Sequence, residues 1–345
     1  MRSLSPILLA LLLAPKAAVA QDSDNSITPL FAEDAILDIK LDGPIRAIAR
    51  RAARSTDPAD ARLKSEGEIH AITLEARGKS RRRRDICRFP PLRVRFPDKP
   101  KEASLFHKQG SLKLVTHCRN SSSYDQYLLR EYAVYRLYNL VTPESLNVRL
   151  LEVTYTDDGD NIATRPGFFI EDGDDAARRL GVKEVDTGDL PISAINPKDG
   201  ARYAVFQYLI GNTDWAMAVG PDPTDCCHNS KLFGDATDAR TDLTPVPYDF
   251  DNAGLVDAPY AVPNEALATR DVRTRVYRGF CRFNDLIPGE VANLQRLRPT
   301  FESELRTIPG LSERTVAAML AYLASGFDGM ADARAIERNL IRDCR

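Results

Sequence analysis

The sequence has no excess of charge of either sign, since 47 Lys and Arg stand against 49 Asp and Glu and the formal net charge is -2. Without such an excess, we expect no nucleic-acid partner and no general electrostatic attraction to a membrane. Internal repeats and low-complexity blocks are also missing, which argues against a solenoid or a disordered chain. With 43% apolar residues among 345, the chain can bury one large core or two smaller ones.

Long apolar runs are missing after residue 20, where no stretch approaches the roughly 20 apolar residues that span a bilayer. The chain begins Met-Arg-Ser-Leu-Ser, continues with a short apolar run, and has Ala-Val-Ala before Gln21. This pattern is typical of a secretory signal peptide that ends at Ala20. The alternative is a retained membrane anchor, to which the late Lys16 points. We therefore expect an exported protein, periplasmic or extracellular, with no stable membrane span.

Cysteine pairs at CxxC spacing are missing as well, although six cysteines are present and Cys226, Cys227 and His228 stand together. Thiolate and imidazole are ligands that zinc prefers, but adjacent cysteines rarely both reach one tetrahedral metal. In an exported protein we favour disulfides over zinc. Cys87 and Cys118 lie in neighbouring predicted strands and should pair, which leaves Cys226 and Cys227 to pair with Cys281 and Cys344.

Strand-like alternation dominates the first half of the chain, at residues 70–78, 87–96, 110–118, 147–157 and 163–172. The first two of these strands are joined by a basic turn, Lys79 to Arg84. The second half is mostly helical, with helical patterns at residues 199–212, 290–308, 312–327 and 330–345. These patterns predict a signal peptide (1–20), an N-terminal extension (21–66), a β-rich lobe (67–171) and a helical lobe (172–345), and hence an α+β fold with two lobes.

The helix predicted at residues 122–143 has a charged residue on its apolar face. Its inward stripe at spacings of three and four contains Glu131 among Tyr and Leu residues. A buried carboxylate is costly unless a cation meets it, and Lys113 on the preceding strand is the natural candidate. The alternative is that Glu131 reaches solvent at the edge of the stripe.

Oxygen-bearing side chains gather on three loops of the second half, at Asp214, at Asn229, and at Asp249 and Asp251. Carboxylate and amide oxygens suit Mg²⁺, which binds them and phosphate oxygens in preference to thiolates. One Asp is then free to orient a substrate hydroxyl for attack.

In this order the residues resemble the protein-kinase-like fold, and most closely its atypical branches, the spore-coat CotH family and the HipA-like kinases. The motifs that carry the resemblance are Gly211-Asn-Thr-Asp-Trp215, the later Asn229, and the Asp-Phe-Asp that follows Tyr248. The resemblance implies a two-lobed protein-kinase-like fold with ATP and Mg²⁺ or Mn²⁺ bound between the lobes.

The same resemblance implies roles for single residues. Lys113 would hold nucleotide phosphates and pair with Glu131, and Asp214 would be the catalytic base. Asn229 and Asp249 would hold the metal, and Asp251 is the alternative to Asp249.

Two features of this sequence differ from the motif pattern of those families. Their metal-binding Asn follows the catalytic Asp by five residues, whereas that position is Val219 here and Asn229 stands fifteen residues after Asp214. The stretch 219–228 must therefore loop out. A glycine run over the phosphates is also missing, and the cluster Lys79 to Arg84 either replaces it by charge or is a solvated turn.

The leading hypothesis is an exported, atypical kinase-like phosphotransferase that moves a phosphoryl group from ATP to an unidentified acceptor, which can be a protein, glycan, lipid or small molecule. One alternative is a catalytically inactive binding or scaffold protein. Another is a metal-dependent hydrolase that uses the same carboxylates.

Overall fold

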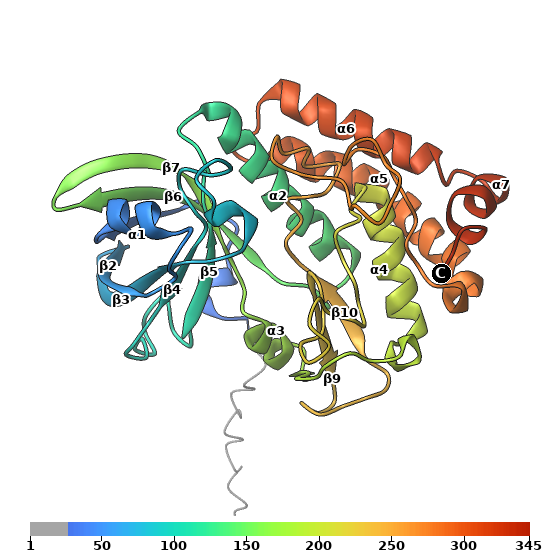
Figure 1. Ribbon diagram of the computed structural model, residues 1–345, viewed down its shortest axis with the longest axis horizontal. Helices are drawn as coiled ribbons and strands as arrows, with labels where there is room; N and C mark the ends of the chain where they lie inside the picture. The colour runs from blue at the N-terminus through green and yellow to red at the C-terminus, as the bar shows by residue number, and fades with distance from the viewer. Residues whose placement is uncertain (1–26) are drawn as a thin grey trace, which may run out of the picture.

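The computed structural model describes residues 27–345, which form a seven-stranded barrel, a second small sheet and a group of helices (Figure 1). The predicted signal peptide, residues 1–20, lies outside the described residues.

The barrel closes in the order β1-β2-β3-β4-β5-β7-β6. β1 and β6 pair in parallel, with Leu37 opposite Leu151, and all other neighbours in the barrel are antiparallel. The strands are β1 (Leu37–Asp42), β2 (Ala59–Ser65), β3 (Glu68–Ala76), β4 (Leu92–Arg95), β5 (Ser111–Val115), β6 (Val148–Asp157) and β7 (Asp160–Ile170), with the short helix α1 (Ile45–Arg51) between β1 and β2.

Alternation along the strands divides their side chains between two cores. In β5, Leu112 and Leu114 face the barrel interior, whereas Val115 joins the core of the helices. In β7, Phe169 points inward and Phe168 points toward the helices. Because successive side chains of a strand lie on opposite faces, Lys113 lies on the face of β5 opposite to Leu112 and Leu114.

The helices pack on one side of the barrel (Figure 1). α2 contacts β6 and β7 on one side and α5 on the other, so it links the barrel to the remaining helices. The helices are α2 (Ser122–Val141), α3 (Gly173–Arg179), α4 (Pro197–Ile210), α5 (Ile287–Thr307), α6 (Glu313–Asp328) and α7 (Ala333–Ile336), and a π-helical turn (Glu337–Ile341) follows α7.

A second sheet lies beside α3 and α4, in the strand order β10-β9-β8. Its strands are β8 (Lys183–Glu184), β9 (Ser230–Gly234) and β10 (Thr244–Pro247). The chain segment before β9 and the one after β10 carry predicted site residues, so this small sheet fixes where those residues lie.

The expected two-lobed protein-kinase-like fold is wrong. The strands of the first half close into a seven-stranded barrel, so the chain combines a closed mixed barrel with helices. The pairing of β1 with β6 closes the barrel, and β1 and β2 come from residues 37–65, which the sequence pattern placed in an N-terminal extension. Residues 37–42, Leu-Asp-Ile-Lys-Leu-Asp, alternate apolar and charged side chains, so the local strand signal of β1 was present in the sequence and was missed.

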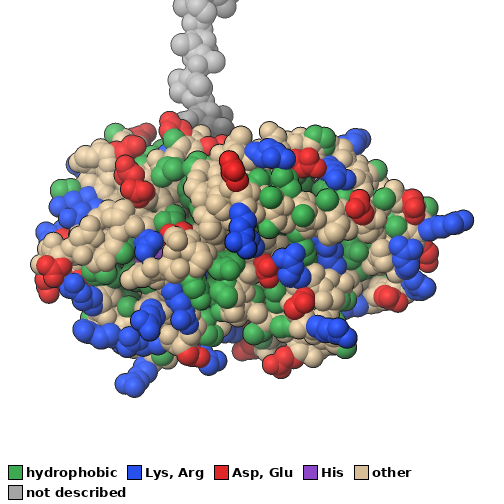
Figure 2. All heavy atoms as spheres, turned by 90° about the horizontal axis from the view of Figure 1, so that it is seen from above, with side chains coloured by type: hydrophobic (Ala, Val, Ile, Leu, Met, Phe, Trp, Pro, Cys, Tyr) green, Lys and Arg blue, Asp and Glu red, His purple; other side chains and the backbone are tan. Residues whose placement is uncertain are grey.

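None of the helices within residues 27–345 is long and apolar enough to cross a membrane. Figure 2 shows acidic and basic side chains interspersed over one face of the molecule, with hydrophobic side chains between them. This distribution agrees with the near-neutral charge of the sequence.

Candidate functional site

Five predicted site residues line one cavity of about 650 Å³ between the barrel and the small sheet. They come from β5, from the turn after α4, from the position just before β9 and from the loop after β10, and they are Lys113, Asp214, Asn229, Asp249 and Asp251. Residues more than 130 positions apart in the sequence therefore meet around one space.

The end of α4 determines the position of Asp214. Gly211 ends this helix in the left-handed conformation, with φ of 65°, where glycine is favoured because it has no Cβ. The chain then turns, and the side-chain oxygen of Asn212 accepts a hydrogen bond from the backbone N–H of Asp214 at 2.9 Å. Arg278 donates to the backbone oxygens of Thr213 and Trp215, which holds the turn in place.

The carboxylate of Asp214 accepts three side-chain hydrogen bonds. His228 Nε2 lies 2.7 Å from Oδ1, and Oδ2 accepts from Asn252 Nδ2 at 2.8 Å and from Asn229 Nδ2 at 3.1 Å. Burial pushes the pKa of Asp214 upward, but the hydrogen bond and charge of His228 bring that pKa below its usual value. The hydrogen bond to Asp214 in turn raises the pKa of His228. Asp214 is thus held as an oriented carboxylate.

The predicted loop between Asp214 and Asn229 returns to its starting point. Ala216 and His228 exchange two backbone hydrogen bonds, of 2.9 and 3.1 Å, so the stretch 217–227 projects as a closed loop. Asn229 then adopts a positive φ of 52°, a conformation that Asn tolerates better than most residues. Its Nδ2 donates to Asp214, which leaves its side-chain oxygen available for another partner.

Lys113 lies in a cationic part of the cavity. Its Nζ stands 4.6 Å from the centre of the Tyr248 ring, and Arg93 is its direct neighbour across strands β4 and β5. Within residues 27–345, neither Lys113 nor Arg77 forms an ion pair, while Lys231 pairs with Glu184. Burial, and then the charges of Arg77 and Lys231, lower the pKa of Lys113 to about 8.

Of the two alternatives for Glu131, the buried one holds, but its partner is not Lys113. The side chain of Glu131 is 2% exposed and pairs with the guanidinium of Arg81 at 3.4 Å. Arg81 comes from a 3-10 turn, Ser80–Arg82, in the loop between β3 and β4. Burial raises the pKa of Glu131 to about 8 even though Arg81 opposes that shift.

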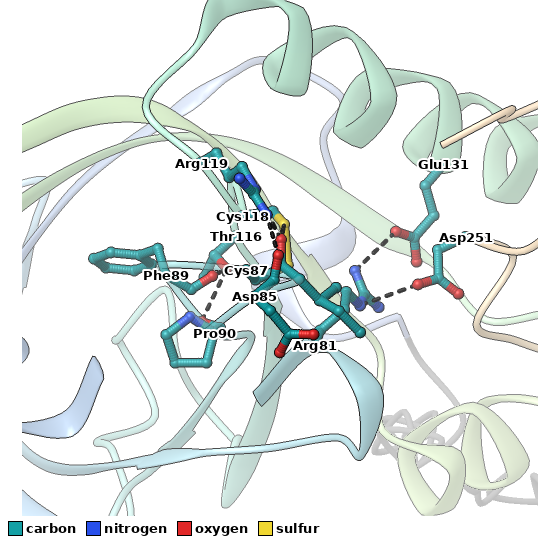
Figure 3. The surroundings of a disulfide bond; sticks show 11 residues. Arg81, Asp85, Cys87, Phe89, Pro90, Thr116, Cys118, Arg119, Glu131 and Asp251 are labelled. Carbon is teal, nitrogen blue, oxygen red and sulfur yellow. Dashed lines mark hydrogen bonds and ion pairs between the residues drawn. A yellow bond between two sulfur atoms is a disulfide. The ribbon is translucent and has the colours of Figure 1, made fainter. Parts of the chain in front are cut away.

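Asp249 and Asp251 also meet Arg81. Asp249 Oδ1 lies 3.0 Å from its NH2 group, and Asp251 Oδ2 lies 3.1 Å from its Nε (Figure 3 draws the second contact). Asp249 has a positive φ of 59°, and its backbone N–H donates to Tyr135 Oη at 2.8 Å. Burial raises the pKa of Asp251 to about 7, although Arg81 opposes that shift too.

The donor set fits a hard divalent cation, provided that the cation arrives with a ligand. No group of three or more His, Cys, Asp or Glu side chains in the described part of the chain is arranged to hold a metal by itself. However, Asp249 and Asp251 each give Arg81 only one oxygen, so the second carboxyl oxygen of each is left for another ligand. Mg²⁺ often binds through one or two carboxylates together with substrate phosphates.

All six cysteines form disulfides. The predicted pair Cys87–Cys118 is confirmed. The other prediction is wrong, because Cys226 pairs with Cys227 and Cys281 pairs with Cys344. The disulfide within the stretch 219–228 therefore joins two adjacent residues of that loop, and the Cys281–Cys344 disulfide ties residue 281 to the C-terminal part of the chain.

Sequence reasoning missed several residues around the site. Arg81 entered the prediction only as one member of the basic cluster Lys79 to Arg84. Asn252, which directly follows the Asp-Phe-Asp motif, was given no role, although it donates a hydrogen bond to Asp214. The same cavity is also lined by Arg77, Arg93 and Lys231. The charge of these residues was visible in the sequence, but their convergence depends on the closure of the barrel.

Comparison with known proteins gives no support for a family. No family model matches the chain, and no curated protein matches it significantly. The expected resemblance to the CotH and HipA-like kinases is therefore wrong, because neither the barrel nor any relative supports it.

Proposed function

We propose that the protein transfers a phosphoryl group from ATP or a similar nucleotide to an acceptor, with Mg²⁺ or Mn²⁺ as the accompanying cation. The observation that carries this proposal is the division of charge in one cavity. Lys113 and Arg77 stand without carboxylate partners among residues 27–345, and the acids Asp214, Asp249 and Asp251 line the same space. Nucleotide phosphates with their cation have the complementary charges.

The cationic part of the cavity supports phosphate binding. Arg93 and Lys113 are cross-strand neighbours, and like charges in that arrangement repel each other, although Glu75 pairs with Arg93 at 3.2 Å and offsets part of its charge. Of the nearby acids, Glu184 pairs with Lys231, and Asp172 caps the start of α3. A bound phosphate would relieve the repulsion and would hold the ammonium of Lys113 in its charged form.

Asn229, Asp249 and Asp251 would hold the cation. Their available atoms are the side-chain oxygen of Asn229 and the carboxylate oxygens that Arg81 leaves unpaired. The cation would neutralise charge on the phosphates that it shares with these residues.

Asp214 is suited to orient the acceptor. It lies where the large cavity meets a second one of about 440 Å³, which is lined on its other sides by Trp215, Val262 and Pro263 among others. An acceptor hydroxyl in the second cavity would donate to a carboxylate that His228, Asn229 and Asn252 hold in place. Asp214 would then direct the attacking oxygen and accept its proton as the new bond to the γ-phosphorus forms, while the bond from that phosphorus to the β–γ bridging oxygen breaks and the nucleoside diphosphate leaves.

Export is part of the proposal. Three disulfides within residues 27–345 support it, because disulfides persist mainly in oxidising compartments. The pattern of residues 1–20 in the sequence supports it independently.

A transfer assay with radiolabelled ATP and mixed protein, glycan and lipid acceptors tests the proposal. Asp214→Asn and Asp249→Asn should each lower the transfer rate by roughly 10²-fold or more. Asp60→Asn, at an exposed position on β2, is the matched control and should transfer at the wild-type rate. Equal rates in all variants would contradict the proposal. Nucleotide binding without transfer to any acceptor would favour the scaffold alternative.

A further inference from the structure

Arg81 is the most deeply buried cation of the cavity. Its side chain is 7% exposed, and its three nitrogens face three different acids. NH1 faces Glu131 on α2, NH2 faces Asp249, and Nε faces Asp251. One side chain from the barrel therefore joins α2 to the loop after β10, in the arrangement that Figure 3 shows for Glu131 and Asp251.

The loop that carries Arg81 is fastened to the end of β5 by several bonds. The Cys87–Cys118 disulfide closes it, and the guanidinium of Arg119 donates to the backbone oxygens of Asp85 and Ile86 (Figure 3). Further along, Phe89 N donates to the oxygen of Cys118 at 3.0 Å. The turn within the loop is also bonded, because the N–H of Cys87 donates to the oxygen of Arg83 at 2.9 Å. The backbone on the C-terminal side of Arg81 is thus anchored close to its side chain.

Stability alone gives a poor reason for this arrangement. Burying ions is costly, and a buried ion pair often adds less stability than apolar side chains of the same volume. Here three acids share one guanidinium, and Glu131 Oε1 is buried without a hydrogen-bond partner among residues 27–345. A guanidinium can, however, fix the directions of several carboxylates at once, because its donors lie in a rigid plane.

We propose that Arg81 is a positioning residue, which holds Asp249 and Asp251 in the arrangement that receives a phosphate-bound cation, and that the Cys87–Cys118 disulfide keeps Arg81 in place. That a phosphate-bound cation is the ligand rests on the proposed function. That Arg81 fixes the two Asp side chains rests on its own contacts with them. The outward oxygens of the two Asp residues then keep fixed directions although they lie on a loop.

Two readouts test this inference, and the first needs no ligand. Hydrogen exchange of residues 248–253 should speed up at least several-fold in Arg81→Met. Arg81→Lys, which keeps the charge but not the planar fork, should give an intermediate rate. The double variant Cys87→Ala/Cys118→Ala should change exchange in the same direction as Arg81→Met.

The second readout is the affinity for Mn²⁺ in the presence of a non-hydrolysable ATP analogue, followed by electron paramagnetic resonance. We expect roughly tenfold weaker binding in Arg81→Met and in Cys87→Ala/Cys118→Ala. Cys281→Ala/Cys344→Ala is the matched control, because it removes a disulfide that encloses a longer loop, with 63 against 31 residues of separation. It should lower the melting temperature and leave Mn²⁺ affinity unchanged.

The two readouts separate the inference from the proposed function. If the wild type binds no Mn²⁺ with the nucleotide analogue, the proposed function fails, and the exchange rates still decide the role of Arg81. Unchanged exchange at residues 248–253 in both Arg81 variants would overturn the inference. Tighter Mn²⁺ binding in Arg81→Met would also overturn it, because Arg81 would then compete with the cation instead of preparing its site.

Discussion

Asn229 Nδ2 donates a hydrogen bond to the backbone oxygen of Asp214 at 2.8 Å, although fifteen positions separate the two residues. The backbone pairing of Ala216 with His228 makes this contact possible, since it returns the chain to its starting point. The length of the loop 217–227 therefore does not decide where Asn229 lies. The side-chain oxygen of Asn229 remains free to meet a cation in the cavity that it shares with Asp249.

Replacing Asn229 should separate cation binding from the orientation of Asp214. Asn229→Ala removes the oxygen that we assign to the cation and one donor to Asp214. We expect roughly tenfold or greater weakening of Mn²⁺ affinity in the presence of nucleotide. Titration calorimetry measures this change directly.

Asn252→Ala is the matched control for this prediction. Asn252 donates to the same oxygen of Asp214, at 2.8 Å, but we assign it no contact with the cation. This variant should bind Mn²⁺ within about twofold of the wild type, and its effect should fall on the transfer rate. Equal loss of Mn²⁺ affinity in both variants would remove Asn229 from the cation site.

The sequence was informative wherever the signal was local. Alternation in residues 110–118 predicted β5 and the face of Lys113, and the apolar stripe of α2 placed Glu131 on the inward face of that helix. Barrel closure has no such signal, because the parallel pairing of Leu37 with Leu151 joins segments more than 100 residues apart. The fold class was therefore misjudged although most of its elements were predicted.

The candidate site was predictable to a similar extent. Asp214, Asn229 and Asp249 line one cavity, and each stands in a motif of recognisable chemistry. The partner of Glu131 was misjudged because two cations compete for it. Lys113 lies on β5, the strand that precedes α2 in the sequence. Arg81 reaches Glu131 from the loop between β3 and β4, whose path depends on the Cys87–Cys118 disulfide.

Nucleotide binding should depend on pH through Lys113, whose pKa burial lowers to about 8. The protonated ammonium attracts phosphate, so affinity should be nearly constant below about pH 8. Above that pH it should fall by up to about tenfold per pH unit, until the raised pKa of the bound state is reached. Fluorescence titration with a labelled ATP analogue between about pH 7 and about pH 9.5 measures this dependence.

Two variants identify Lys113 as the source of the pH dependence. The Lys113→Arg variant keeps its charge through this range because the guanidinium does not lose its proton, so its affinity for the ATP analogue should change little above pH 8. The Lys113→Met variant should bind the analogue weakly at every pH, with an affinity that does not depend on pH in this range. A wild-type slope that persists in Lys113→Met would assign the dependence to another group.

Gly211, which ends α4 at the turn that carries Asp214, should tolerate no side chain. A Cβ at Gly211 would stand 2.0 Å from Tyr322 Oη, and the φ of 65° already disfavours other residues. We expect Gly211→Ala to lower the free energy of unfolding by about 2 kcal/mol or more. Urea denaturation measures the loss.

Gly289→Ala is the control for this prediction. Gly289 lies near the start of α5, where an added Cβ would meet no atom within 4 Å and where φ is not positive. Alanine there should leave the free energy of unfolding unchanged or raise it by about 0.5 kcal/mol. Similar destabilisation in both variants would show that the contact with Tyr322 is not the cause.

Acid should destabilise the protein through His117, which is fully buried beside Phe89 and Tyr155. Burial lowers the pKa of His117 from its usual 6.5 to about 4, although a hydrogen bond with Asn120 opposes the shift. Between these two values the unfolded chain binds a proton that the folded chain excludes. The contribution of His117 is therefore complete above about pH 6.5 and declines as the pH falls toward 4.

The size of this effect follows from the shift of the pKa of His117. A change from 6.5 to about 4 corresponds to a loss of about 3 kcal/mol at the acid end. His117→Gln cannot gain that proton, so its free energy of unfolding should fall less steeply between about pH 7 and about pH 4.5. Other titrating groups act equally in both proteins and cancel in the difference. Parallel curves for the wild type and His117→Gln, measured by urea denaturation, would mean that His117 gains its proton in the folded state as readily as in the unfolded chain.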